Sequence, residues 1–144
     1  MGFRFETILK LNKNKEDLLQ KELGQINAFI QKKKDSQNFL NDMMGEKKEE
    51  LNKKKREDIN LQTMTLYDNF FCGIQLYNTR QDRIISEVNI KLEKKREEVI
   101  NAMRKRRTLE ILKDRELLKV KDLKQKKLLA IQDEITSNLW TRKH

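Results

Sequence analysis

Residues 85–109, ISEVNIKLEKKREEVINAMRKRRTL, carry the pattern that decides the fold. Apolar side chains recur in this stretch at steps of three, four or seven residues, at Ile85, Val88, Leu92, Val99, Ala102 and Leu109. The stripe continues to Val120, Leu123 and Ala130, and polar residues occupy the positions in register between them: Lys95, Arg106, Lys113, Glu116 and Lys127. Heptad spacing of this kind is typical of a coiled-coil helix with a single contact face.

The first part of the chain carries a second stripe of the same kind. Its apolar positions are Phe5, Leu9, Leu19, Leu23, Ile26, Ile30, Leu40, Met44 and Leu51. Its polar positions in register are Asn12, Glu16, Lys33, Gln37 and Lys47. The pattern predicts a single coiled-coil domain over 1–144, with helices at about 3–58 and 65–140 joined by a turn at about 59–64. Asn60 is expected as the left-handed C-cap of the first helix, and Thr65 as the N-cap of the second.

Three arrangements of these helices are open from the pattern alone. We predict an all-α fold in which the two helices form an antiparallel hairpin. One alternative is an uninterrupted helix of roughly 210 Å, at about 1.5 Å per residue, which would need a dimer to cover its stripe. The other is a parallel homodimeric rod. A turn near Gln62 would leave the second helix uncovered beyond about Lys121, so that roughly 30 Å of it overhangs at the C-terminus.

Composition excludes most functions that depend on chemistry. The 144 residues include no proline, four glycines, 39% charged residues and 36% hydrophobic residues. One histidine, His144, and one cysteine, Cys72, cannot supply a zinc site or a Cys/His catalytic pair. The glycines lie too far apart for a phosphate-binding loop. We therefore predict no enzymatic activity, no metal, no cofactor and no small-molecule substrate.

The sequence also bears on the location of the protein. It contains no apolar run of the roughly 18 residues that a membrane span requires, and its first residues lack the apolar block of a signal peptide. A lone cysteine suits a reducing compartment. These features predict a cytoplasmic protein.

Aromatic residues cluster just after the predicted turn, at Tyr67, Phe70, Phe71 and Tyr77. Tyr67 and Phe71, together with Ile74, are in register with the apolar stripe and are expected to close the hairpin there. Phe70 and Tyr77 fall to one side, where a thin coiled coil buries aromatic rings poorly. An exposed aromatic patch usually marks a contact site, although core packing is the alternative.

The end of the second helix combines positive charge with apolar residues. Residues 63–144 carry 19 Lys and Arg against 12 Asp and Glu, whereas residues 1–62 carry 14 against 11. An apolar stripe in this end has no first helix opposite it: Leu128, Ile131, Ile135 and Leu139, beside Trp140. It is interpreted as a docking surface, a frayed tail or a packing surface.

The basic run 104–107 is either a solvated face or a footprint for nucleic acid or an acidic protein. No aromatic residue lies between Arg80 and Leu139, so the sequence does not support binding to single strands.

Three segments resemble the flagellar export protein FliJ family: FRFETILKL at 3–11, RKRRTLEILKDR at 104–115, and Asp133–Glu134. The resemblance implies an antiparallel two-helix coiled coil, similar to the central stalk of rotary ATPases, in the type III export apparatus. It implies that the terminal end of the coil enters the hexameric export ATPase FliI and that the protein contacts the export gate FlhA and export chaperones. It further implies a cytoplasmic position, peripheral to the membrane at the flagellar base.

The resemblance also assigns residues to these contacts. A gate-contacting aromatic and aliphatic pair falls on Phe70 and Ile74, with Tyr67 and Tyr77 beside them. For the ATPase it implies contacts at Phe3, Phe5, Leu9, Arg106, Arg107, Leu109, Leu112 and Asp133. The uncovered apolar stripe adds Leu128, Ile131 and Ile135 as predicted ATPase contacts. The alternatives are the equivalent stalk of a virulence injectisome, and a basic coiled coil that binds nucleic acid or an anionic membrane.

Overall fold

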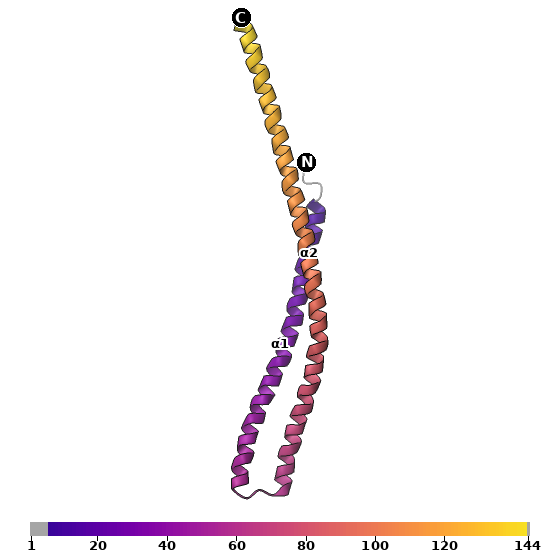
Figure 1. Ribbon diagram of the computed structural model, residues 1–144, viewed down its shortest axis with the longest axis vertical. Coiled ribbons are helices and arrows are strands. Elements are labelled where there is room, and N and C mark those ends of the chain that lie inside the picture. The colour runs from indigo at the N-terminus through magenta and orange to yellow at the C-terminus, as the bar shows by residue number, and fades with distance from the viewer. Residues whose placement is uncertain (1–5, 144) are drawn as a thin grey trace. The chain divides into compact units, whose positions relative to one another are not determined.

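The computed structural model describes residues 6–143, which form two long α-helices (Figure 1). Helix α1 spans Glu6–Arg56 and has 51 residues, and α2 spans Leu61–Lys143 and has 83 residues. The two helices pack against each other and no strand occurs among the described residues, so the predicted all-α hairpin is confirmed. Phe3 and Phe5 lie outside the described residues.

The connection between the helices is shorter than the sequence predicted. α1 ends after four basic residues, Lys53 to Arg56, whose charge complements the negative end of the helix dipole. Asn60 then caps the start of α2, because its side-chain Oδ1 accepts a 2.8 Å hydrogen bond from the backbone N–H of Thr63. No described residue has a positive φ, so the predicted left-handed C-cap at Asn60 is wrong. Thr65 lies inside α2, where its hydroxyl donates to the Leu61 carbonyl at 2.9 Å, and it is not the N-cap.

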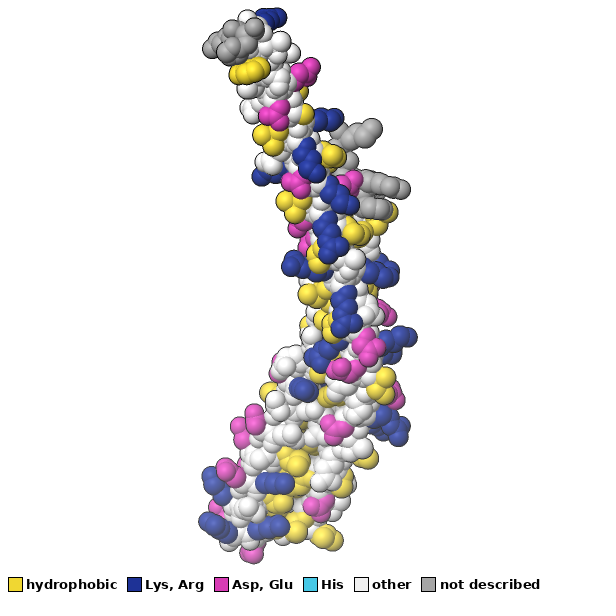
Figure 2. Space-filling model, turned by 45° about the horizontal axis from the view of Figure 1, so that its top comes forward, with side chains coloured by type: hydrophobic (Ala, Val, Ile, Leu, Met, Phe, Trp, Pro, Cys, Tyr) yellow, Lys and Arg dark blue, Asp and Glu magenta, His cyan; other side chains and the backbone are white. Residues whose placement is uncertain are grey.

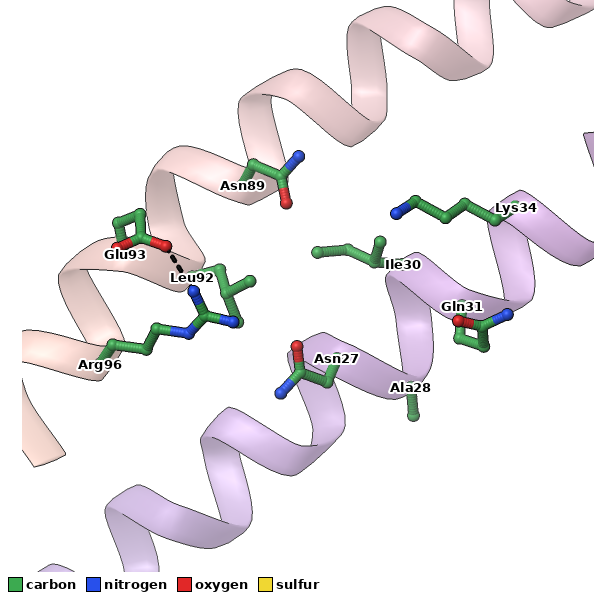
Figure 3. A pocket seen from close by; sticks show the side chains of 9 residues that line it. All are labelled: Asn27, Ala28, Ile30, Gln31, Lys34, Asn89, Leu92, Glu93 and Arg96. Carbon is green, nitrogen blue, oxygen red and sulfur yellow. Dashed lines mark hydrogen bonds and ion pairs between the residues drawn. The ribbon is translucent and has the colours of Figure 1, made fainter.

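The chain divides into two compact units, one of which comprises residues 19–98. In this unit α1 and α2 run side by side up to their connection (Figure 1). Ile30 of α1 and Leu92 of α2 are buried with Ile85, and half-buried Leu23, Ile26 and Val88 pack around them. Figure 3 shows Ile30 and Leu92 pointing into the space between the helices. Nearer the connection, Leu51 and Ile74 are buried as well.

Polar contacts across this unit establish that the helices are antiparallel. Lys95 Nζ donates to Glu22 Oε2 at 2.7 Å, and Gln37 Nε2 donates to Asp82 Oδ1 at 2.8 Å. The Tyr67 hydroxyl lies 3.3 Å from Glu50 Oε2. As the position on α1 rises from 22 to 37 to 50, the number of its partner on α2 falls from 95 to 82 to 67.

The other unit comprises residues 1–18 and 99–144. Val99, Ala102 and Glu16 are buried where α1 and α2 meet in this unit. From Leu117 to Arg142 every side chain of α2 is exposed, so the covered part of the helix ends slightly earlier than the predicted boundary near Lys121. Val120, Leu123 and Ala130 continue the apolar stripe in sequence, but α1 does not cover them. Within 6–143, neither helix has a stretch apolar enough to cross a membrane.

Candidate partner-binding surfaces

The first candidate surface is the aromatic cluster in the early turns of α2. The rings of Phe70 and Phe71 meet edge to face with centroids 5.9 Å apart, and Phe71 lies 6.3 Å from Tyr67. All three rings, and that of Tyr77, are half-buried. Aromatic pairs with this geometry are worth about 0.5–1.5 kcal/mol beyond the area that they bury. The cluster is therefore held in place and still presents aromatic surface to the solvent.

Basic residues of α1 support the cluster from the other helix. Lys54 Nζ lies 5.2 Å from the centroid of the Tyr67 ring, and Lys48 Nζ lies 6.0 Å from that of Phe71, which are distances for cation–π attraction. Glu50 accepts hydrogen bonds from both Lys47 and the Tyr67 hydroxyl. The hydrogen bond from Lys47 is the largest cause of the lowered pKa of Glu50.

The predicted gate residues differ in their exposure. Ile74 is only 5% exposed and belongs to the packed face of α2, as its register indicated. Phe70 is half-buried, and Tyr77 lines a shallow groove with Phe39 and Leu40 of α1. Phe70 and Tyr77 therefore offer accessible surface to a partner, whereas Ile74 is buried in the helix packing.

The second candidate surface lies in the unit of residues 1–18 and 99–144. Its centre is an ion pair between Arg106 Nε and Glu16, whose side chain is 6% exposed. Arg106 also donates to Glu110 Oε1 at 2.9 Å. The Glu16 carboxylate, and after it that of Glu110, raises the pKa of Arg106. Arg107, in contrast, is largely exposed and lies 3.9 Å from Glu110.

Some of the predicted ATPase contacts in this unit lie in the packing between the helices, and others are exposed to solvent. Leu9 and Leu109 are half-buried, as their positions in the stripes predicted. Leu112 is 40% exposed, and Arg107 points its charge into the solvent. Arg106 is committed to Glu16 and Glu110, so its main contribution is to hold the helices together here.

The third candidate surface is the uncovered end of α2. Leu128, Ile131, Ile135 and Leu139 are each 53–60% exposed, Trp140 is 66% exposed, and Asp133 is also exposed. Residues 117–143 carry seven Lys and Arg against three Asp and Glu. The basic residues lie at 119–127 and 142–143, whereas 128–141 contain no Lys or Arg and hold Asp133 and Glu134. The upper part of Figure 2 shows hydrophobic side chains on the surface of the helix, with both basic and acidic side chains along it. Positive charge therefore precedes and follows the apolar stripe, while the stripe itself carries two acidic residues.

One polar cluster was not predicted from the sequence. In residues 19–98, Gln37 and Asn41 of α1 are hydrogen-bonded to Asn78 and Asp82 of α2, and Gln81 is buried beside them. The signal was present, because Asn78 and Gln81 occupy the heptad positions between Ile74 and Ile85.

The geometry defines a class of protein, a two-helix coiled-coil hairpin whose candidate sites are surfaces for partners. A family model described as "Flagellar FliJ protein" matches residues 1–144, and the chain belongs to the FliJ family. This is a family of flagellar export components and not a family of enzymes. Searches of curated proteins and of solved structures found no match to the chain.

Proposed function

We propose that this protein is a non-enzymatic stalk of the flagellar type III export apparatus. In this role its terminal end enters the centre of the hexameric export ATPase FliI and promotes assembly and activity of the hexamer. Its turn end contacts the export gate FlhA. The observation that carries the proposal is the exposed, basic, apolar-striped end of α2 in a chain of the FliJ family.

The apolar stripe provides the favourable free energy for insertion into a ring. Each of Leu128, Ile131, Ile135 and Leu139 exposes more than half of its surface. Full burial of such a side chain is worth about 1.5–3 kcal/mol, so covering the exposed half yields roughly 1 kcal/mol for each residue. Four residues together contribute about 4 kcal/mol before the cost of association.

The positive charge that flanks the stripe, at 119–127 and 142–143, favours a ring with an acidic inner surface. Seven basic residues against three acidic ones create an attraction that orients the helix and speeds its encounter with such a surface. Arg107 and Leu112 extend this surface toward the paired part of the helices. The stalk would act by differential binding, because an asymmetric rod stabilises some subunit interfaces of a symmetric ring more than others.

The turn end supplies a separate contact. The half-buried rings of Phe70, Tyr77 and Tyr67 present aromatic surface that a gate protein can cover, and Ile74 on the same helix is buried. Buried aromatic side chains are common at the centres of interfaces. Contacts at the two ends would link ATPase and gate, place the protein at the cytoplasmic side of the membrane through its partners, and leave other surfaces for export chaperones.

The proposal is tested by the activity of the cognate export ATPase with and without the full chain. Wild-type protein is expected to raise both ATP hydrolysis and the hexamer content measured by light scattering. The double variant Ile131→Gln/Ile135→Gln removes apolar area without changing charge and should lose most of the stimulation.

The matched control is Gln125→Ala/Gln132→Ala, which alters two exposed polar residues of the same helix and should stimulate like the wild type. Circular dichroism verifies the helix content of each variant. Absence of stimulation by folded wild-type protein, or full stimulation by the isoleucine variant, would contradict the stalk mechanism.

A further inference from the structure

A layer of amide and carboxylate side chains crosses the helix packing in the unit of residues 19–98. Gln37 Nε2 of α1 donates to the backbone carbonyl of Asn78 at 3.2 Å and to Asp82 Oδ1 at 2.8 Å. Asn78 Nδ2 of α2 donates in return to Asn41 Oδ1 at 2.8 Å. We call Gln37, Asn41, Asn78, Gln81 and Asp82 the polar layer.

The polar layer is partly shielded from water and incompletely satisfied. Gln81 is 7% exposed, and Gln37 and Asn78 are half-buried. The side-chain oxygens Asn78 Oδ1 and Gln81 Oε1 are buried and accept no hydrogen bond. Buried acceptors without a donor lower stability, because their hydration is lost without replacement. The layer therefore weakens the helix pair at a point where apolar residues would strengthen it.

Apolar packing borders the layer on both sides within this unit. Ile30, Ile85 and Leu92 are buried on one side, and Leu51 and Ile74 on the side of the connection. Apolar heptad contacts tolerate sliding, since a shift by seven residues again places apolar residues opposite each other. After such a shift Gln37 would face the apolar residues near Ile74 or Ile85, and its hydrogen bonds to α2 would be lost.

A slip of one heptad would have to be accommodated at the short connection, residues 57–60, between the helices. Residues 57–60 contain neither glycine nor proline, and no described residue there adopts a positive φ. The start of α2 depends on the side chain of Asn60, and α2 has no acidic residue in its first turn. A shift could therefore be accommodated by unwinding the helix ends next to the connection.

We infer that the polar layer is a register lock: it selects one alignment of α1 on α2 at a cost in stability. A single buried polar residue is known to fix register in coiled coils in this way. The lock determines which side chains of α2 are paired and which stay available to partners. It rests on the hydrogen bonds of the layer and is independent of the proposed function.

The experiment measures register directly in the full chain. Spin labels are placed at the exposed positions Lys32→Cys and Lys91→Cys in a Cys72→Ser background. The labelled chain is diluted with unlabelled chain, so that electron–electron double resonance reads only distances within one molecule. A slip of one heptad changes the axial offset between the labels by about 10 Å.

Wild-type protein should give one narrow distance distribution. Replacing the interior of the layer, Gln37→Leu/Asn78→Leu/Gln81→Leu, should add a second distance while the urea midpoint stays equal or rises. The control Gln31→Leu/Gln75→Leu changes exposed amides outside the layer and should keep the single distance. A single unchanged distance in the triple variant would overturn the inference.

A second variant covers the case in which the leucine variant fails to fold. Gln37→Ala/Asn78→Ala removes the cross-helix hydrogen bonds without adding bulk, and helix content by circular dichroism shows that it remains folded. A second distance in this variant supports the register lock. One distance identical to that of the wild type refutes it.

Discussion

Two neighbouring substitutions in α2, Phe70→Ala and Ile74→Ala, should separate partner binding from stability. Ile74 is 5% exposed, so truncation removes buried methylene and methyl groups from the helix packing. Such truncations cost 2–5 kcal/mol in globular cores. A two-helix coil can close around the gap more easily, and we expect about 2–3 kcal/mol here.

Phe70 is less buried than Ile74, so Phe70→Ala should lower the free energy of unfolding by less than Ile74→Ala. The Phe70 ring is half-buried and forms an edge-to-face pair with that of Phe71 at 5.9 Å. Loss of that pair and of part of the buried area amounts to about 1–2 kcal/mol. The surface that it presents to a partner is lost completely. Binding should therefore suffer more than stability.

The assays are urea unfolding followed by circular dichroism at 222 nm and calorimetric titration with the cytoplasmic part of the gate protein. Phe70→Ala should weaken binding by about tenfold or more, which corresponds to about 1.4 kcal/mol. Ile74→Ala should lower the free energy of unfolding more than Phe70→Ala but bind nearly normally under conditions where it is fully folded.

Leu76 provides the control, because it lies on the same helix, is 61% exposed and faces away from the buried residues. Leu76→Ala should change neither the free energy of unfolding nor the affinity for the gate protein by a measurable amount. The reasoning fails if folded Ile74→Ala binds as poorly as Phe70→Ala, since Ile74 would then contact the partner itself. It also fails if Phe70→Ala binds like the wild type.

Three further predictions concern the elements that position these surfaces. Asn60→Ala removes the N-cap of α2 and should lower the free energy of unfolding by about 1 kcal/mol in urea titrations, whereas Asn60→Asp should retain most of it. Glu16→Gln takes the charged partner from Arg106 and should lower the thermal midpoint, and an unchanged midpoint would show that the ion pair adds nothing. Hydrogen bonding to Glu22 is the largest cause of the raised pKa of Lys95. This stabilisation is complete below the ordinary lysine pKa and is lost as pH rises through the raised value, so alkaline titration should narrow the stability gap between wild type and Lys95→Met.

The paired part of the fold follows from the period of the sequence. Each described position of the first stripe, from Leu9 to Leu51, is buried or half-buried, including polar residues such as Glu16 and Gln37. Heptad position determines which face of a helix meets its partner, whatever the polarity of the individual residue. The heptad pattern is therefore sufficient to predict the two helices and the faces through which they contact each other.

The connection was harder to predict because its signals are ambiguous. Asparagine is favoured at both ends of helices, and neither glycine nor proline distinguishes the two roles here. The sequence pattern favours Asn60 at the end of α1, although the structure shows that it caps α2. The polar layer was missed for another reason: the sequence places Asn78 and Gln81 on the contact face but does not reveal which residues of α1 they meet.

The uncovered end of α2 is helical for reasons that lie in its own sequence. Residues 117–143 contain no glycine or proline and include six leucines and six lysines, which favour helices. The segment is longer than the roughly 12–15 residues below which isolated helices are marginal. A helix that is already formed pays less ordering entropy on binding than a disordered tail. Most of the roughly 4 kcal/mol of free energy from burying the stripe, Leu128 to Leu139, therefore contributes to affinity for a partner.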